Sequence, residues 1–475
     1  MRDTAIPVSD STTSDAPDRL PLSTKLAFGA GDLGPAIATG VLSFFQLFFL
    51  TTVAGIPANI AGTILLVVKI WDAFSDPVVG WLSDRTVSKH GRRRPWLLYG
   101  AIPFGIAFFL IWLVPPLGDT GKIVYYLVLM LIFNTLFTVV NVPYTALTPE
   151  LTRDYDERTS LNAYRFAFSI GGALFAATAH QIIVTSFCVS PETCQGVAQQ
   201  TGYMAAGVFW GLLIVLPFFW CFAGTKERQT TPLSKDEMSL FDQVRVALSN
   251  RPFLFVIGIY LCSWLAVQIT ASIIIFYVTF WLQNPDFIPL ILLAVQGSAF
   301  IFLFMWNAVS RRIGKKAVYI TGMSFWIAVQ LALFFVQPGQ ETLALILAVL
   351  AGVGIATAYL IPWSMMPDVI ELDELETGQR REGIFYGFMV LLQKLGLALG
   401  LFLVGQVLAF QGFREEAPIG QQPESALFAI RLMLGPVPAV VLICGIVLAI
   451  FYPITKQKHE EMLARIRTRR SGQGG

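Results

Sequence analysis

Charged residues are scarce in this chain of 475 residues, because Asp, Glu, Lys and Arg together make up 13% of it. Soluble globular proteins carry about 25%. Hydrophobic residues make up 55%, and the mean hydropathy is +0.64. This composition excludes a soluble globular protein and predicts an all-α membrane protein, whose solvent is the lipid bilayer.

Histidine and cysteine are also rare, with three and five copies. Only His180 falls in a long apolar stretch, where we interpret it as a hydrogen-bonded packing residue. The cysteines lack the spacing of zinc ligands, and no glycine-rich phosphate loop precedes a Lys-Ser pair. We therefore expect no enzyme activity, no cofactor and no use of ATP.

Twelve stretches are long and apolar enough to cross a bilayer, for which a helix needs about 20 residues. An even number of spans places both termini on the same side. We expect a disordered polar tail at 1–25 without a signal peptide, and a second tail at 454–475. The spans are expected at 26–53, 58–83, 96–115, 122–147, 161–187, 201–223, 253–282, 287–309, 316–337, 341–366, 383–412 and 425–453.

Basic residues predict which side the termini face, because loops rich in Lys and Arg stay in the cytoplasm. Of the 33 basic residues, only Lys122 and Arg414 lie in the odd-numbered connections. The others, apart from those within spans, lie in the tails and the even-numbered connections. We expect cytoplasmic termini in a bacterial inner (plasma) membrane. Charge spread over loops in this way gives no reason to expect a nucleic-acid partner.

Two cysteines fall in the connection between spans five and six, which the charge rule places outside the cell. Cys188 and Cys194 are separated by five residues. They form either a local disulfide or two free thiols, and the sequence favours neither.

Two phrases of the chain occur twice at nearly the same offset. Pro143-Tyr144-Thr145 leading to Pro149-Glu150 matches Pro362-Trp363-Ser364 leading to Pro367-Asp368. Gly91-Arg92-Arg93 likewise matches Gly314-Lys315-Lys316. The matches predict two six-helix bundles, 26–223 and 253–453. The linker at 224–252 contains LFDQVRVAL, which is typical of a short amphipathic surface helix.

The connection after span two resembles the signature of the major facilitator superfamily. It reads Gly80-Trp-Leu-Ser-Asp84-Arg85 and then Gly91-Arg92-Arg93-Arg94, with a longer spacer than the commonest form. The resemblance implies two pseudo-symmetric bundles around a central cavity, with alternating access. Asp84, Arg85 and Arg92 are candidate gating residues, although the arginines also serve as a positive-inside anchor.

Three ionisable residues stand in the middle of span two, where a charge is costly unless it is paired. Lys69, Asp72 and Asp76 share one helical face. Two carboxylates four residues apart can bind Na⁺ or a proton, because oxygen ligands suit Na⁺ and mutual repulsion favours protonation. The alternative is a structural ion-pair network with Lys69. Lys394, in span eleven, is the expected cationic partner of the acids.

Span four carries a milder polar stripe formed by Asn134, Thr138 and Asn141. These side chains either contact the substrate or form hydrogen bonds between helices. The sequence does not distinguish the two roles.

A closer resemblance covers nearly the whole chain. The phrases WDAFSDPVVGW, VPYTALTPELTRDYDERTSLNAYRF and IPWSMMPDVIELDELETGQRREGIFYGF are similar to those of the glycoside-pentoside-hexuronide:cation symporters, a family that includes sugar carriers and sodium-dependent lysophosphatidylcholine symporters. The resemblance implies that Asp72 and Asp76 bind the cation, that Lys394 is the coupling lysine, and that Arg165 lines the substrate path. We also expect Lys69 to take part in coupling and Trp363 to contact the substrate.

The chain departs from the sugar carriers where those proteins grip the sugar. Ala36 and Asn141 stand where they have aspartates, and Thr145 stands where they have a tryptophan. We expect a monomeric symporter, surrounded by membrane lipids, that couples Na⁺ or H⁺ to a sugar or glycoside. The alternative substrate is a lysolipid or another amphiphile. Thr138, Asn141 and Thr145 remain candidate substrate contacts. A channel, a receptor and a membrane enzyme are the competing classes.

Overall fold

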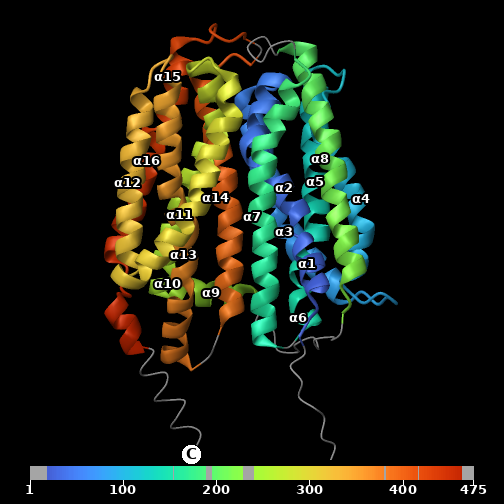
Figure 1. Ribbon diagram of the computed structural model, residues 1–475, viewed down its shortest axis with the longest axis vertical. Helices are drawn as coiled ribbons and strands as arrows, with labels where there is room; N and C mark the ends of the chain where they lie inside the picture. The colour runs from blue at the N-terminus through green and yellow to red at the C-terminus, as the bar shows by residue number, and fades with distance from the viewer. Residues whose placement is uncertain are drawn as a thin grey trace, which may run out of the picture.

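A computed structural model describes residues 19–152, 154–188, 195–227, 240–378, 381–415 and 417–462. In this part of the chain, twelve helical segments are long and apolar enough to cross a membrane. The twelve expected spans are therefore confirmed. Figure 1 shows the first six, blue to green, on one side and the last six, yellow to red, on the other.

The first six spans are built from eight α-helices and one π-helical turn: α1 (Leu22–Ala30), α2 (Leu33–Phe48) and η1 (Phe49–Val53); α3 (Ala58–Asp84); α4 (Arg94–Ile111); α5 (Asp119–Thr145) with α6 (Thr148–Leu151); α7 (Tyr155–Thr185); and α8 (Gly196–Gly224).

The expected surface helix is present as α9 (Leu240–Ser249), and the last six spans follow it: α10 (Arg251–Phe276) with η3 (Tyr277–Trp281); η4 (Pro285–Phe287) with α11 (Ile288–Ile313); α12 (Lys315–Phe335); α13 (Glu341–Thr377); α14 (Glu382–Phe410); and α15 (Glu424–Leu434) with α16 (Pro436–Phe451).

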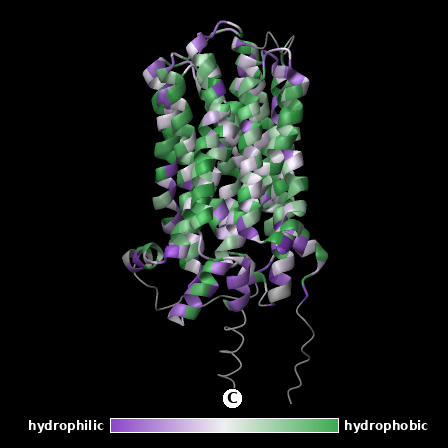
Figure 2. Ribbon diagram, turned by 90° about the vertical axis from the view of Figure 1, so that its left-hand side faces the viewer, coloured by the Kyte–Doolittle hydropathy of each residue, from purple (hydrophilic) through white to green (hydrophobic). Residues whose placement is uncertain are grey.

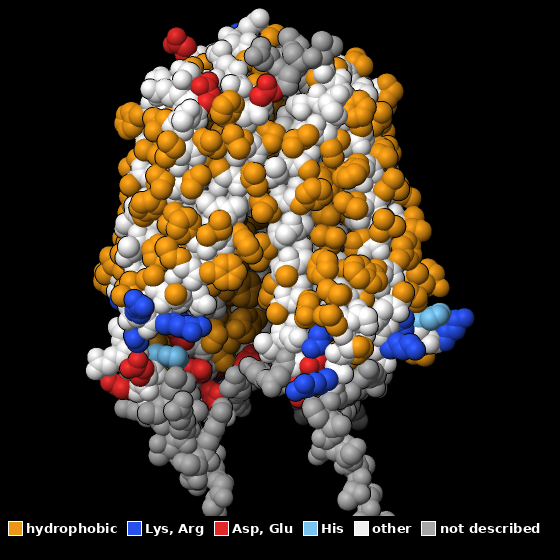
Figure 3. Space-filling model, in the orientation of Figure 1, with side chains coloured by type: hydrophobic (Ala, Val, Ile, Leu, Met, Phe, Trp, Pro, Cys, Tyr) orange, Lys and Arg blue, Asp and Glu red, His pale blue; other side chains and the backbone are white. Residues whose placement is uncertain are grey.

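The outer surface of the bundle is apolar. Leu212, Leu216 and Ile301 are more than half exposed. Figure 3 shows hydrophobic side chains over the middle of the molecule, with Lys and Arg gathered toward its lower end and Asp and Glu at both ends. Figure 2 shows the same division by hydropathy. Such a surface is suited to contact with lipid.

The first and last described residues lie at the lower end of the bundle in Figure 1, which we call the terminal end. At the other, far end, α3 and α14 are in close contact. A Cβ atom on Gly405 would lie 2.4 Å from the carbonyl oxygen of Ala58. The Glu415 carboxylate accepts a hydrogen bond from the Ala58 N–H at 3.1 Å, and the Gln406 amide donates to the carbonyl of Asn59 at 3.0 Å.

Toward the terminal end α14 has open space beside it. A Cβ atom on Gly383 or Gly387 would meet no described atom within 4 Å outside its own stretch of helix. Figure 3 shows a hollow between the two halves here, lined by hydrophobic side chains. The structure is therefore closed at the far end and open toward the terminal end.

Span ten continues well past its expected end at residue 366, because α13 runs to Thr377. The extension carries acidic residues that have cationic partners. Lys315 contacts Asp368 at 2.6 Å, and Arg381 contacts Asp373 at 2.6 Å. These ion pairs stabilise helix that projects beyond the apolar stretch.

His180 is fully buried in α7, but both of its ring nitrogens lack a hydrogen-bond partner among the described residues. The expectation of a hydrogen-bonded histidine is wrong. The imidazole packs instead among the rings of Phe45, Trp112 and Tyr203, with centroid distances of 4.5, 4.9 and 5.5 Å. Its role in packing holds.

Candidate functional site

Two aspartates and a lysine project from one face of α3 in the middle of the bundle. Asp72 and Asp76 are one helical turn apart, and Lys69 lies one turn before Asp72. Asp72 is 1% exposed. A carboxylate at this depth is stable in its ionised form only beside a cationic group or a bound cation.

Lys394 of α14 brings such a cation from the other half of the molecule. Its ammonium donates a hydrogen bond to Asp76 and lies 3.8 Å from Oδ2 of Asp72. The expected contact between Lys394 and the aspartates is present, and it joins the two halves across their interface.

Lys69 forms a second ion pair on the same face. Its Nζ lies 3.2 Å from Oδ2 of Asp72 and donates to Oδ1 of Asn134 on α5 at 2.8 Å. Each aspartate is therefore paired with a lysine, and the structural network that the sequence left open as an alternative exists alongside the pairing with Lys394.

The acid pair offers oxygen atoms suited to a hard cation. Thr138 donates to Oδ1 of Asp76 at 2.8 Å. Oδ1 of Asp72 is buried and has no hydrogen-bond partner among the described residues. Na⁺ prefers such oxygen ligands, and Asp72, Asp76 and Thr138 can supply them once the ammonium of Lys394 moves away. A proton would instead be held by one of the two carboxylates.

A cavity of about 450 Å³ opens beside this cluster, between the two halves. Its polar lining includes Lys69, Asp72 and Lys394, together with amide side chains from both halves. The amides are those of Gln46, Asn134, Asn141, Gln268, Gln296 and Gln393. Aromatic rings, among them Trp264 and Tyr359, face the same space. Such a lining is suited to a solute with both polar and apolar surface.

Of the five residues expected to bind substrate, the structure places only Asn141 in this lining. Thr138 is buried behind it and contacts Asp76. The hydroxyl of Thr145 donates to the carbonyl of Val142 in its own helix at 3.0 Å. The hydroxyl group of Thr145 therefore donates its hydrogen bond within α5.

Trp363 and Arg165 also contact other protein groups. The Trp363 ring stacks on Tyr386 with a centroid distance of 6.0 Å. Arg165 contacts Asp32 in span one at 3.3 Å. Asp32 was not among the predicted site residues, although it is an acid within an expected span, as Asp72 is. Trp264 and Tyr359 gave no such signal, because aromatic residues are common in spans.

The signature after span two forms an ion-pair cluster at the terminal end. Asp84 is the last residue of α3 and forms an ion pair with Arg93. Arg92 and Arg93 both contact Glu150, at 2.8 and 3.3 Å. Arg85 takes no part in these contacts and packs its guanidinium 4.1 Å from the ring of Trp81. Among the three candidate gating residues, the structure thus brings Asp84 and Arg92 into one cluster.

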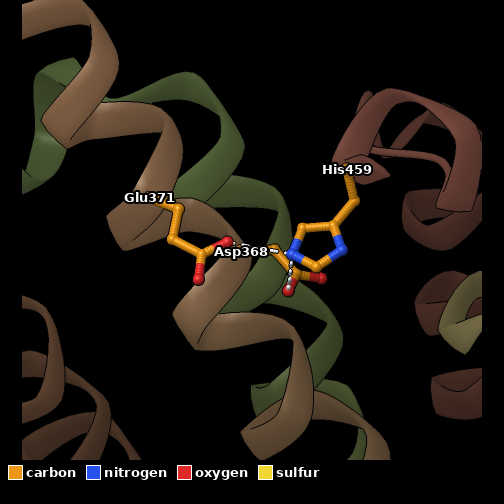
Figure 4. Close-up of side chains that lie close together, drawn as sticks. All are labelled: Asp368, Glu371 and His459. Carbon is orange, nitrogen blue, oxygen red and sulfur yellow. Dashed lines mark hydrogen bonds and ion pairs between the residues drawn. The ribbon is translucent and has the colours of Figure 1, made fainter. Parts of the chain in front are cut away.

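The second half repeats this arrangement. Lys315 contacts Asp368 at 2.6 Å, and both residues belong to the phrases that match Arg92 and Glu150. The repeated phrases therefore encode equivalent ion pairs. His459 adds a contact to Asp368 at 3.3 Å and one to Glu371 at 2.9 Å (Figure 4). This group of metal-ligating residue types was not apparent from sequence spacing, because the fold brings His459 back to α13.

The sequence left open whether Cys188 and Cys194 are free thiols or disulfide-bonded, and the structure answers this for one of them. Cys188 is disulfide-bonded, whereas Cys221, Cys262 and Cys444 are free thiols. Cys194 lies outside the described residues.

Comparison with known proteins identifies the family. The family model described as "MFS/sugar transport protein" matches residues 27–456. The chain belongs to this family. It is a major facilitator transporter, as the helical fold and the sequence resemblance indicated.

Several relatives match along nearly their whole length. An uncharacterised symporter of Synechocystis is 43% identical, with 95% of this chain and 98% of the relative covered. The sodium-dependent lysophosphatidylcholine symporter 1 of Gallus gallus is 32% identical, with 94% and 89% covered. A putative 2,3-dihydroxypropane-1-sulfonate exporter of Salmonella typhimurium is 30% identical, with 98% and 99% covered.

Among solved structures, the nucleoside transporter NupG superposes with a TM-score of 0.61 at 14% identity, over 90% of this chain and 98% of that one. At this identity the likeness concerns the fold alone.

Proposed function

We propose that this transporter is a cation-coupled symporter that works by alternating access. The coupling ion, Na⁺ or H⁺, binds at Asp72 and Asp76, with Thr138 as a further oxygen ligand for Na⁺. Lys394 neutralises the acids when the ion is absent.

The contact of Lys394 with both aspartates carries this proposal. A buried ammonium and a cation compete for the same carboxylates, because both cannot be held there without excess positive charge. Since Lys394 belongs to the second half and the acids to the first, ion binding changes a bond that joins the halves. This link gives the ion a means to alter the conformational equilibrium.

Alternating access requires that one end be closed while the other is open. Contacts between α3 and α14 at the far end, together with the open space beside α14 toward the terminal end, support an intermediate of such a cycle. The distribution of basic residues favours a cytoplasmic terminal end in a bacterial plasma membrane. In that orientation the structure is an inward-open carrier.

A sugar or glycoside is the first candidate substrate. Amide groups such as those of Asn141 and Gln393 can both donate and accept hydrogen bonds with hydroxyl groups, and the ring of Trp264 offers a flat apolar face. The description of the matched family supports the same class.

A lysolipid is the second candidate. The named activity of the chicken relative favours it, and so do Phe44, Phe133 and Phe137, which give the cavity a large apolar surface. An acyl chain would occupy such a surface.

Transport by the full chain in sealed proteoliposomes tests the proposal. The test compounds, which we call the panel, are D-glucose, D-glucuronate, methyl β-D-galactoside, glycerol, 2,3-dihydroxypropane-1-sulfonate and a lysophosphatidylcholine. We expect saturable accumulation of at least one compound, driven by an imposed Na⁺ or pH gradient. Uptake that only equilibrates and ignores both gradients would contradict symport.

A further inference from the structure

The buried charges beside the central cavity form two matched ion pairs. Lys69 pairs with Asp72, and Lys394 pairs with Asp76. Two ammonium groups thus balance two carboxylates, and the cluster is neutral when all four groups are ionised. An empty carrier can therefore hold these groups in the membrane without excess charge.

The nearby ionic groups do not alter this balance. Asp32 is matched by Arg165 at 3.3 Å, so this pair is also neutral. Among the described residues that line the cavity, Asp72 is the only acid, whereas Lys69 and Lys394 are both cationic. No other acid in this lining is available to neutralise an additional positive charge.

Binding of a coupling ion adds one positive charge to the cluster. The two ammonium groups and the cation together carry three positive charges against two carboxylates. Even after Lys394 moves away from the acids, its charge remains beside the cavity, and the surplus is one positive charge. The result is the same for Na⁺ at the acid pair and for a proton on one carboxylate. A surplus charge in a medium of low dielectric is unfavourable unless an anion joins it.

We propose that the substrate carries one net negative charge, and that Lys69 binds its anionic group. This inference rests on the proposed cation coupling and narrows the substrate class. Suitable compounds are sulfonates, carboxylates such as acidic sugars, and singly charged phosphate esters. The anion restores neutrality when the coupling ion is bound.

Lys69 is better placed for this role than Lys394. Both side chains are 23% exposed and line the cavity, so the difference lies in their partners. The 2.8 Å hydrogen bond of Lys69 to Asn134 is independent of the acid pair, so it holds the ammonium at the cavity wall when a cation takes Asp72. The carboxylates that Lys394 contacts both belong to the cation pair.

The expected signature is mutual dependence of cation and anion. Each should raise the affinity for the other by the same factor, because linkage is reciprocal. Transport of one cation with one monoanion should also be electroneutral, whereas transport of a neutral compound with one cation would move a positive charge.

Calorimetric titration of the purified full-length protein with Na⁺, and separately with protons, tests the inference. Each titration is run alone and with two matched pairs from the panel: D-glucuronate against D-glucose, and 2,3-dihydroxypropane-1-sulfonate against glycerol. At least one anion should increase cation affinity about tenfold or more, as expected for a hydrogen-bonded ion pair, while its neutral partner changes it less than about twofold.

Two lysine variants locate the effect. Lys69→Gln should abolish the anion effect, and it should strengthen cation binding without anion because Asp72 loses its ammonium partner. Lys316→Gln removes the same charge at the terminal end, where the ammonium donates to the Ile450 carbonyl at 2.6 Å, and should retain the full effect. If Lys69→Gln does not fold, the test is instead the effect of the membrane potential on uptake of the anion by the wild-type protein. Electroneutral uptake, which does not respond to the potential, is expected.

Three results overturn the inference: no anion raises cation affinity, a neutral partner raises it equally, or uptake moves a net positive charge. Cation-dependent binding of a neutral sugar would refute the proposal that the substrate is an anion, but it would leave the proposed symport intact. If neither Na⁺ nor a proton binds, the proposed symport fails, and the surplus charge on which the anion depends never arises.

Discussion

Lys394 and Asp76 are 318 positions apart in the chain and yet share a hydrogen bond. The bond joins α14 to α3, and therefore the second half of the transporter to the first. It lies between close helix packing at the far end and open space toward the terminal end. A charge change at this bond is thus placed where it can alter how the halves meet.

Replacing either aspartate by asparagine should remove cation coupling. Asp72→Asn and Asp76→Asn each delete a negative charge with little change in volume, so we expect a fall in cation affinity of about tenfold or more. Calorimetric titration with Na⁺ and protons measures it. Asp119→Asn, at the start of α5, is the matched control and should bind the cation as the wild type does. Unchanged affinity in Asp72→Asn would place the cation elsewhere.

A methyl group at Gly405 should disfavour the closed far end. Its Cβ would lie 2.4 Å from the backbone oxygen of Ala58, and such overpacking costs about 1–3 kcal/mol. In Gly405→Ala we expect faster hydrogen exchange of the amides at 58–65. Gly387→Ala adds the same methyl group to α14 where no described atom lies within 4 Å. Equal exchange in the two variants would mean that this contact does not close the far end.

Glu227 should stabilise the terminal end of the first half. Its carboxylate accepts hydrogen bonds from the backbone N–H groups of Arg92, Arg93 and Arg94 at 2.7, 2.9 and 2.9 Å, where α4 begins. Glu227→Gln should lower the free energy of unfolding by about 1.5–3 kcal/mol. Thermal unfolding of the detergent-solubilised protein measures the loss. The exposed Glu424→Gln should change stability by less than about 0.5 kcal/mol, and a similar loss in both would refute a specific role.

His180 should be replaceable by phenylalanine. Its buried nitrogens have no hydrogen-bond partner among the described residues, and its neighbours are aromatic rings. Removal of an unsatisfied buried polar group should raise stability by about 1–3 kcal/mol. A higher unfolding temperature of His180→Phe with unchanged cation affinity is the expected result. Lower stability would show that a polar partner of the imidazole exists.

The fold was predictable because its signals are strong and local. Each span is a long apolar stretch, and polar loops, many of them basic, separate one span from the next. The ends of helices were harder to predict. The extension of α13 to Thr377 is paired with Arg381, just beyond the end of the helix, and with Lys315, which lies in another part of the chain. Pairing with a distant residue such as Lys315 gives no periodic signal in the extension itself.

The candidate site was predictable where it depends on buried charge. Asp72, Asp76 and Lys394 stand out because ionised groups are rare in spans, and their contact follows from the need for neutrality. The substrate contacts were less accessible to this reasoning. Thr145 and Arg165 turned out to contact other protein groups, and only the three-dimensional arrangement of the helices determines which polar side chains face the cavity.

The central claim, that Lys394 neutralises the acid pair when the ion is absent, is tested most directly by Lys394→Gln in proteoliposomes. The substrate is the panel compound with the largest gradient-driven uptake in the wild type. Exchange of internal for external substrate need not pass through the empty carrier, whereas net accumulation must. We predict that Lys394→Gln retains exchange but loses accumulation, and that Lys394→Arg, whose wider guanidinium stays charged, does not restore it. Accumulation equal to that of the wild type in Lys394→Gln would contradict the account.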